Sequence, residues 1–275
     1  MMGPLVDVAW LEEHHDDPSV RIADVRSAGS SALNRAAYEA GHIAGAVFFD
    51  MEADLAGPGG GRHPLPDAAE FAALLGTRGI GSDHQVVVYD DSAGAAACRL
   101  WWMLRSLGHD RVALLDGGWQ AWQEAGHDLS TDVPDLPATS FEGDGWQGMV
   151  TADELVKEAG AMTLLDARGN DRYRGENEVL DPVAGHIPTA VSTPFADNLD
   201  ARGRFRSPAE LASIYAPHSE GNIVAYCGSG VTAAHTLIAL ELAGIEGARL
   251  YPGSWSDWIT DPSRPQATGA EPGSL

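Results

Sequence analysis

A cysteine lies between an apolar run and a glycine-rich turn in the second half of the chain. Residues 223–226 form the apolar run, Cys227 follows directly, and an apolar helical pattern extends over 231–242. A strand, a turn and a helix in this order place the cysteine beside a helix N-terminus, where backbone N–H groups lack helical partners. These groups stabilise a thiolate and can hold an anion attached to its sulfur. The pattern predicts a nucleophilic cysteine, with a buried structural cysteine as the alternative.

Composition limits the partners that the chain can have. Its 275 residues carry a formal net charge of −23, which repels nucleic acid and anionic membranes, so neither is expected as a partner. An anionic substrate needs local positive groups, which only 17 Lys and Arg residues can supply. The histidines show no ligand spacing with cysteine or with one another, so no metal site is expected.

The two cysteines, Cys98 and Cys227, indicate a reducing compartment rather than a disulfide framework. The chain shows no signal-peptide pattern and no apolar run of the ~20 residues that a membrane span needs. A cytoplasmic protein outside the membrane is therefore expected. Cys98 lies within a predicted helix and is interpreted as a core residue.

The chain contains a tandem repeat with a period of about half its length. An Asp-x-Arg pair, a Gly-His-Ile turn and a Trp-x-x-Trp pair recur in the same order. They are found at 24–26 and 166–168, at 41–43 and 185–187, and at 119–122 and 255–258. A stretch rich in Pro, Asp and Ser separates the copies. The pattern predicts domains at 1–130 and 149–275, joined by a linker at 131–148.

Short apolar runs alternate with helical patterns within each copy. In the first copy the predicted strands are 21–25, 46–48, 85–89 and 112–115, and the predicted helices are 68–75 and 95–107. This alternation predicts an α/β fold in which each domain is a parallel sheet with helices on both faces. Ligands of such sheets bind beyond the carboxyl ends of the strands, where Cys227 is expected. The tail after Pro262 is expected to be unstructured.

The repeat separates architectural residues from candidates for chemistry. Features present in both copies are interpreted as architectural. These are the two Asp-x-Arg pairs and the histidines of the Gly-His-Ile turns, namely Asp24, Arg26, Asp166, Arg168, His42 and His186. Asp90 aligns with Cys227, so only the second copy carries a thiol at this position. The loop after Asp90 lacks a Gly-x-Gly pattern, and its N–H groups are not expected to converge on one atom.

Two asymmetries between the copies mark further candidates. Arg172 lies six residues after Asp166, where the first copy has Ser30, in a segment interpreted as a loop. A solvated surface arginine and a substrate-binding arginine are both open interpretations of this position. His63 lies where the second copy has Phe205, and it is either a surface residue or a site residue.

The repeated α/β halves and four segments together resemble the tandem-domain sulfurtransferases of the rhodanese family. The segments are Asp-Ala-Arg (166–168), Arg-Tyr-Arg-Gly (172–175), Gly-His-Ile-Pro (185–188) and Tyr-Cys-Gly-Ser-Gly-Val-Thr-Ala (226–233). The resemblance covers nearly all of residues 5–262, and the cysteine loop is most similar to that of 3-mercaptopyruvate sulfurtransferases. It implies two rhodanese-like domains, the first non-catalytic. It also implies sulfur transfer from 3-mercaptopyruvate or thiosulfate, through a persulfide on Cys227, to cyanide, a thiol or thioredoxin.

The resemblance assigns roles to individual residues. Cys227 matches the cysteine that accepts the sulfur, and Arg172 matches the arginine that binds the anionic end of the donor. Ser229 matches a loop serine, and His63 matches a histidine proposed to work with it. Glu52, eleven residues before His63, stands where the family has an aspartate as the acidic partner of this pair.

The loop after the cysteine is implied to bind the transferred sulfur. Amide N–H groups from residues 228–232, together with the helix dipole, can hold a terminal persulfide anion without a metal. Besides Ser229, these residues are Gly228, Gly230, Val231 and Thr232. No cofactor is expected other than the persulfide itself.

Two features bear on the identity of the sulfur donor. The loop has no Lys or Arg at 228–232, which favours 3-mercaptopyruvate, because thiosulfate leaves as sulfite, an anion that needs positive charge nearby. The 3-mercaptopyruvate enzymes also carry a second donor-binding arginine, expected between Gly175 and Gly185, and this chain has none there. We expect a higher kcat/KM for 3-mercaptopyruvate than for thiosulfate, with activity on both.

Two other functions use the same cysteine. A phosphatase of this fold needs an arginine six residues after the cysteine to bind phosphate, and that position is Ala233. A persulfide carrier without turnover needs the same cysteine and loop, and the sequence leaves that alternative open. Persulfide formation without turnover on small acceptors would distinguish a carrier from an enzyme.

Overall fold

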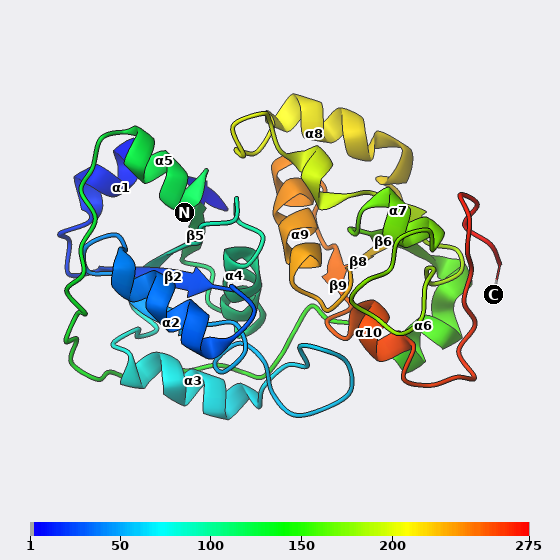
Figure 1. Ribbon diagram of the computed structural model, residues 1–275, viewed down its shortest axis with the longest axis horizontal. Helices are drawn as coiled ribbons and strands as arrows, with labels where there is room; N and C mark the ends of the chain where they lie inside the picture. The colour runs from blue at the N-terminus through cyan, green and yellow to red at the C-terminus, as the bar shows by residue number, and fades with distance from the viewer. Residues whose placement is uncertain (1–2, 275) are drawn as a thin grey trace. The chain divides into compact units, whose positions relative to one another are not determined.

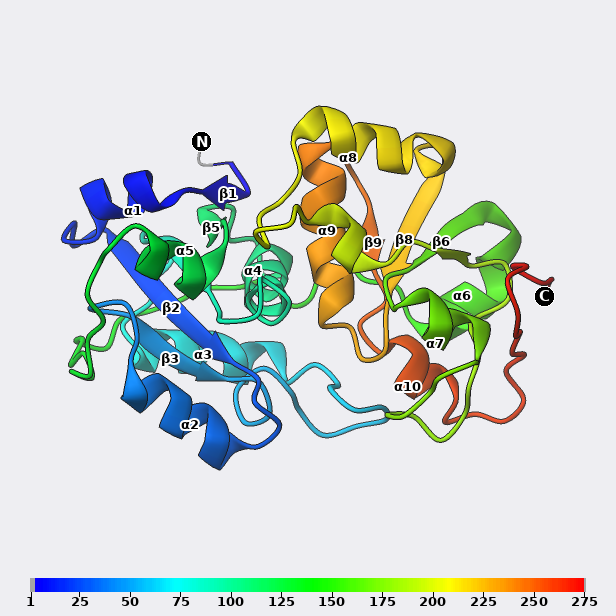
Figure 2. The ribbon, with the colours of Figure 1, turned by 45° about the horizontal axis from the view of Figure 1, so that its top comes forward.

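The computed structural model describes residues 3–274, which form two compact units (Figures 1 and 2). The first unit contains the described chain up to Gly57, Leu65–Gln147 and Arg202–Arg204. The second contains Pro58–Pro64, Gly148–Ala201 and the described chain from Phe205 onward. A short loop from the first half of the sequence, Pro58–Pro64, is thus part of the second unit.

The first unit is built on a parallel sheet with strand order β1-β5-β4-β2-β3. Its strands are β1 (Leu5–Val6), β2 (Val20–Arg26), β3 (Val47–Asp50), β4 (Gln85–Tyr89) and β5 (Val112–Leu115). Its helices are α1 (Val8–His14), α2 (Ser31–Ala40), α3 (Ala68–Thr77), α4 (Ala97–Ser106) and α5 (Gly118–Glu124). Consecutive residues of β4 are fully buried, so helices cover both faces of the sheet.

The second unit has a smaller parallel sheet with strand order β7-β6-β8-β9. Its strands are β6 (Met162–Asp166), β7 (Val191–Ser192), β8 (Asn222–Tyr226) and β9 (Arg249–Leu250). Its helices are α6 (Ala152–Glu158), α7 (Asn170–Arg174), α8 (Pro208–Tyr215), α9 (Thr232–Leu242) and α10 (Ser254–Trp258). Short 3-10 turns occur at Ala159–Ala161, Phe195–Asn198 and Ala216–His218. The helix α9 packs against β8, β9 and α8 (Figure 2).

These two parallel sheets with flanking helices confirm the predicted α/β architecture. The predicted strands at 85–89 and 112–115 match β4 and β5 in full, and those at 21–25 and 46–48 differ from β2 and β3 only at their ends. The apolar run at 223–226 is β8 without its first residue, and the helical pattern at 231–242 is α9 with one extra residue.

The expectation of a loop at 171–175 is wrong, because Asn170–Arg174 forms the short helix α7. Gly175 ends this helix in the left-handed conformation, with φ of 76°, and its N–H bonds back to the Arg172 carbonyl oxygen. A single helical turn buries only one side chain, Tyr173, and is therefore too short to show hydrophobic periodicity in the sequence.

The expectation of an unstructured tail is also wrong. Ala267 and His186 exchange backbone hydrogen bonds of 2.9 and 3.0 Å, and Thr189 N–H donates to the Pro272 carbonyl oxygen. The tail is held by backbone hydrogen bonds, which do not require particular side chains. Its structure therefore could not be predicted from the pattern of residue types. Residues 131–148, expected to link the copies, contain no named helix or strand, and those up to Gln147 belong to the first unit.

The repeated Asp-x-Arg pairs are buried in both units, in keeping with an architectural role. Arg26 bonds to the Asp24 carboxylate and to the Gly41 carbonyl oxygen. Arg168 makes the same two kinds of contact in the second unit, to Asp166 and to the Gly185 carbonyl oxygen. Each pair therefore ties the end of a central strand to the Gly-His-Ile turn.

Candidate active site

Cys227 lies immediately after β8, at the carboxyl end of the parallel sheet and ahead of α9. Its side chain is buried, with the residue 2% exposed. Its N–H donates to the Ser254 hydroxyl at 3.0 Å, and its carbonyl oxygen accepts from Trp255 N–H at 3.0 Å. The start of α10 thereby fixes the backbone of the cysteine.

The loop between Cys227 and α9 accepts only glycine at Gly230. This residue has φ of 74°, and a Cβ there would lie less than 3.0 Å from the Pro252 carbonyl oxygen. The helix α9 begins at Thr232 without a side-chain cap from Val231. Ala234 N–H donates to the Val231 carbonyl oxygen at 3.2 Å, and N–H groups at such a helix start can serve as donors for an anion.

The equivalent loop of the first unit shows what this geometry can hold. The Asp90 carboxylate accepts four hydrogen bonds of 2.7–2.8 Å from the N–H groups of Ser92, Gly94, Ala96 and Ala97. The expectation that this loop cannot converge its N–H groups is wrong. The backbone turns in the left-handed conformation at Gly94, with φ of 85°, and this turn directs the N–H groups toward the Asp90 carboxylate. A Gly-x-Gly pattern is not needed for it. In the first copy, the converging N–H groups of this loop thus bind the carboxylate of Asp90 itself. In the second copy, a cysteine occupies the position of that aspartate.

Two guanidinium groups lie against Gly228, the residue after the cysteine. A Cβ at Gly228 would lie less than 3.0 Å from Arg62 Nη2 and 3.3 Å from Arg172 Nη1. Arg172 has an 18% exposed side chain, so it is not a solvated surface arginine. The sequence did not single out Arg62, because Arg204 occupies the equivalent position in the second copy and no asymmetry marks the residue.

Two buried carboxylates hold these arginines in place. Asp181 accepts from Arg62 Nε at 3.0 Å and from Arg172 Nη2 at 2.9 Å. Glu178 accepts from Arg172 Nε at 3.0 Å and from Arg172 Nη2 at 2.9 Å. Burial raises the pKa of Glu178, but hydrogen bonds from the Leu180 N–H and from Arg172 outweigh it, and the pKa is lowered overall. Glu178 is therefore ionised when it meets Arg172.

The structure brings together two of the residues expected to move a proton. The His63 Nδ1 atom lies 2.7 Å from the Ser229 hydroxyl oxygen, within the second unit. Ser229 is two residues after Cys227 and is 6% exposed. Glu52 belongs to the first unit, where its N–H donates to the Asp50 carboxylate, and its partnership with His63 stays a prediction.

Cys98 has the surroundings of a core residue. It lies in α4 of the first unit and is fully buried. Burial raises the pKa of its thiol well above the ordinary value. Both cysteines are free thiols in the described chain. Cys227, by contrast, precedes α9 and has the guanidinium groups of Arg62 and Arg172 beside the next residue.

Residues 3–274 contain no group of three His, Cys, Asp or Glu side chains arranged to hold a metal ion. In that same part of the chain no helix is both long enough and apolar enough to cross a membrane.

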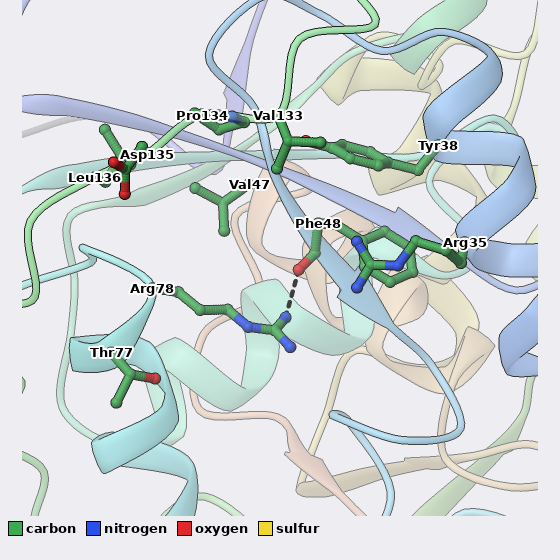
Figure 3. Close-up of a pocket in the computed structure, with 10 residues that line it drawn as sticks. All are labelled: Arg35, Tyr38, Val47, Phe48, Thr77, Arg78, Val133, Pro134, Asp135 and Leu136. Atoms are coloured by element: carbon green, nitrogen blue, oxygen red, sulfur yellow. Dashed lines mark hydrogen bonds between the residues drawn. The ribbon is translucent and has the colours of Figure 1, made fainter.

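A pocket of about 250 Å³ lies in the first unit, between α2, β3 and the end of α3 (Figure 3). The Arg35 guanidinium lies 4.2 Å from the centroid of the Phe48 ring, and Arg78 donates a hydrogen bond to the Phe48 carbonyl oxygen. Val133 and Asp135 line another side. The lining residues, all in the described chain, include no thiol and none of the predicted site residues, so this pocket is not the candidate active site.

Comparisons with known proteins identify the family of the chain. The rhodanese-like domain family matches residues 7–125 and 151–261. A Pseudomonas aeruginosa protein named a probable 3-mercaptopyruvate sulfurtransferase is 47% identical, over 96% of this chain and 98% of its own. A Mycobacterium tuberculosis protein named for thiosulfate sulfurtransferase activity is 41% identical, over 92% of each chain.

A solved structure is similar along nearly the whole chain. The crystal structure of 3-mercaptopyruvate sulfurtransferase from Escherichia coli superposes with a TM-score of 0.82 at 34% identity, covering 93% of this chain and all of that one. With both copies matched and relatives aligned along nearly their whole length, the chain belongs to the rhodanese family and is a tandem-domain sulfurtransferase.

Proposed function

We propose that Cys227 accepts the sulfane sulfur and carries it as a persulfide. The observation that supports this most directly is its position at the end of β8, in front of the uncapped α9, with Arg62 and Arg172 beside the next residue. The four N–H groups gathered on Asp90 in the equivalent loop support the view that this turn binds anions. In the second unit, the amides of residues 228–232 would hold the persulfide anion.

The sulfur-transfer steps balance without any cofactor, and we propose that none takes part. The Cys227 thiolate attacks the donor sulfur. With 3-mercaptopyruvate the C–S bond breaks, and the electron pair leaves as the enolate of pyruvate, which takes up the proton of the donor thiol. With thiosulfate the S–S bond breaks and sulfite leaves with the electron pair. A nucleophilic acceptor then attacks the outer sulfur, and the Cys227 thiolate is released.

We assign the proton transfer to Ser229 and His63. Their 2.7 Å contact makes a path by which a proton can reach the enolate of the 3-mercaptopyruvate donor. Sulfite needs no such proton. Arg62 and Arg172 beside Gly228 supply positive charge for either donor, so the Ser229–His63 contact, which only 3-mercaptopyruvate needs, decides our preference. The donor we favour is 3-mercaptopyruvate, with thiosulfate used more slowly.

The acceptors we propose are cyanide and thiols, including the thiol of thioredoxin, and the compartment we propose is the cytoplasm. Two buried free thiols suit a reducing compartment. Cyanide attacks the persulfide in the same way as a thiolate does, and it releases thiocyanate, which is convenient to measure.

Steady-state turnover with cyanide tests this function. Wild-type protein is mixed with 3-mercaptopyruvate or thiosulfate, and thiocyanate is measured, with Cys227→Ser as the matched variant. We expect turnover with both donors and less than a few per cent of it in Cys227→Ser, because a hydroxyl cannot carry the sulfur. Substantial residual turnover in the variant contradicts the assignment of Cys227. A wild type that accepts sulfur but does not pass it to cyanide or thiols is a carrier rather than an enzyme.

A further inference from the structure

We propose that Arg62 is the second anion-binding residue of the sulfur-donor site and acts together with Arg172. This inference rests on the proposed function of Cys227. The expected second arginine is missing from the segment between Gly175 and Gly185. The structure supplies a guanidinium group at the cysteine loop from another part of the sequence, the loop Pro58–Pro64.

The two arginines present different nitrogen atoms to the cysteine loop. Arg62 uses Nε and Nη2 to bind Asp181, and Arg172 uses Nε and Nη2 to bind Glu178 and Asp181. Within residues 3–274, Nη1 of neither arginine has a hydrogen-bond partner. Nη1 of Arg172 and Nη2 of Arg62 lie close to Gly228, so a donor held beside the loop meets both guanidinium groups.

Asp181 is the positioning residue that brings Arg62 to this place. It occupies the segment in which the second arginine was expected, and its side chain is 2% exposed. A buried carboxylate needs a cation, and Asp181 binds the guanidinium groups of both Arg62 and Arg172. The Arg62 N–H also donates to the Ser256 hydroxyl at 3.0 Å, which fixes the backbone of the loop against α10.

The charges around the loop explain why Arg62 matters for binding. Glu178 and Asp181 carry two negative charges, which Arg62 and Arg172 balance. Removing Arg62 takes away one contact to the donor and also leaves excess negative charge beside it. An anionic donor is then repelled in a protein that already carries a net charge of −23. The chemical class that this pair recognises is a sulfur donor with a carboxylate or sulfur-oxyanion end.

The kinetic test compares Arg62→Ala and Arg62→Lys with Arg174→Ala. Arg174 is a matched control because it lies in the same unit and pairs with Glu176 at the surface. We expect Arg62→Ala to lower kcat/KM about tenfold to a hundredfold for both 3-mercaptopyruvate and thiosulfate, through KM more than kcat. Arg62→Lys should recover part of the loss, and Arg174→Ala should remain within twofold of wild type. An unchanged kcat/KM in Arg62→Ala overturns the proposal.

A binding measurement separates this proposal from the proposed function. Pyruvate, the product left by 3-mercaptopyruvate, is titrated calorimetrically into Cys227→Ser and into the same protein with Arg62→Ala. We expect the affinity for pyruvate to fall at least tenfold when Arg62 is removed, and equal affinities overturn the role of Arg62. A wild-type protein that never gains sulfur on Cys227 overturns the proposed function instead.

The role of Asp181 has its own readout. Asp181→Asn should raise KM for both donors and leave kcat close to the wild-type value, because the reacting groups at Cys227 are untouched. When Asp181→Asn is already present, adding Arg62→Ala should raise KM by a smaller factor than Arg62→Ala does in the wild type. The reason is that Arg62 is no longer held in place without the Asp181 carboxylate. If the effects of the two substitutions on KM are fully additive in free energy, the positioning role of Asp181 is contradicted.

Discussion

Replacing Gly230 with alanine tests whether the shape of the cysteine loop is needed for turnover. A Cβ at Gly230 would meet the Pro252 carbonyl oxygen at less than 3.0 Å. Both atoms belong to the backbone, so no side chain can rotate to relieve the overlap. The loop must shift by roughly 1 Å to restore ordinary contact. A displacement of about 1 Å at a reacting centre can lower the rate about a hundredfold.

Gly244→Ala is the matched control for Gly230→Ala. The two glycines have φ of 78° and 74°, so both variants bear the left-handed strain of about 1–2 kcal/mol. A Cβ at Gly244 would have no neighbour within 4 Å in the described chain, so it causes no overlap. The free energy of unfolding in urea and kcat/KM with 3-mercaptopyruvate and cyanide are measured for both variants.

We expect Gly244→Ala to lose about 1–2 kcal/mol of stability and to keep nearly wild-type kcat/KM. Gly230→Ala should lose more stability and about a hundredfold in kcat/KM. Equal kcat/KM in the two variants would refute the reasoning, because it would mean that the loop tolerates displacement without loss of sulfur transfer.

Three further substitutions test neighbouring parts of the account. Arg172→Lys keeps a charge beside the buried carboxylates but loses the forked contact, so donor kcat/KM should fall about tenfold to a hundredfold, and an unchanged value would remove Arg172 from the site. Ser229→Ala should reduce turnover of 3-mercaptopyruvate more than that of thiosulfate, since only the first needs a proton; steady-state kinetics showing equal losses would contradict this role. Asp90→Asn should lower the free energy of unfolding by about 1.5–3 kcal/mol, because one of the two accepting oxygens becomes an NH2 group and two of the four N–H groups lose their acceptor; an unchanged urea midpoint would refute it.

Arg172 also shows how structure changes the choice of variant. As a solvated arginine it could be replaced by alanine at little cost in stability. Its contacts to Glu178 and Asp181, whose side chains are 3% and 2% exposed, make that substitution leave buried charge unpaired. Loss of activity in Arg172→Ala would therefore mix a binding defect with a folding defect, and lysine is the sharper replacement.

The sequence predicted the sheets because parallel strands buried on both faces appear as continuous apolar runs. The β4 run, Gln85–Tyr89, and the β8 run both ended where expected, and this placed Cys227 at the carboxyl end of a strand. Helix α7 and the tail around Ala267 escaped prediction, since both are held by backbone hydrogen bonds that do not require a side-chain pattern.

The sequence missed Arg62 and misjudged the loop after Asp90 for a related reason. Comparing the two copies treats a repeated residue as architectural, and Arg62 has a counterpart in Arg204. The two arginines differ in the residues that they contact. Arg62 binds Asp181 beside the cysteine loop, whereas Arg204 lies against Gly117. The Asp90 loop gathers its amides through a turn at Gly94, which a motif centred on Gly-x-Gly does not describe.

Mass spectrometry of the sulfur-loaded protein tests the central claim most directly. The protein is mixed with 3-mercaptopyruvate or thiosulfate without an acceptor, and its peptides are mapped under non-reducing conditions. The account predicts one added sulfur on the peptide containing Cys227, its loss when cyanide is added, and an unmodified Cys98, whose thiol is fully buried. Sulfur found on Cys98, or none on Cys227 with either donor, would contradict it.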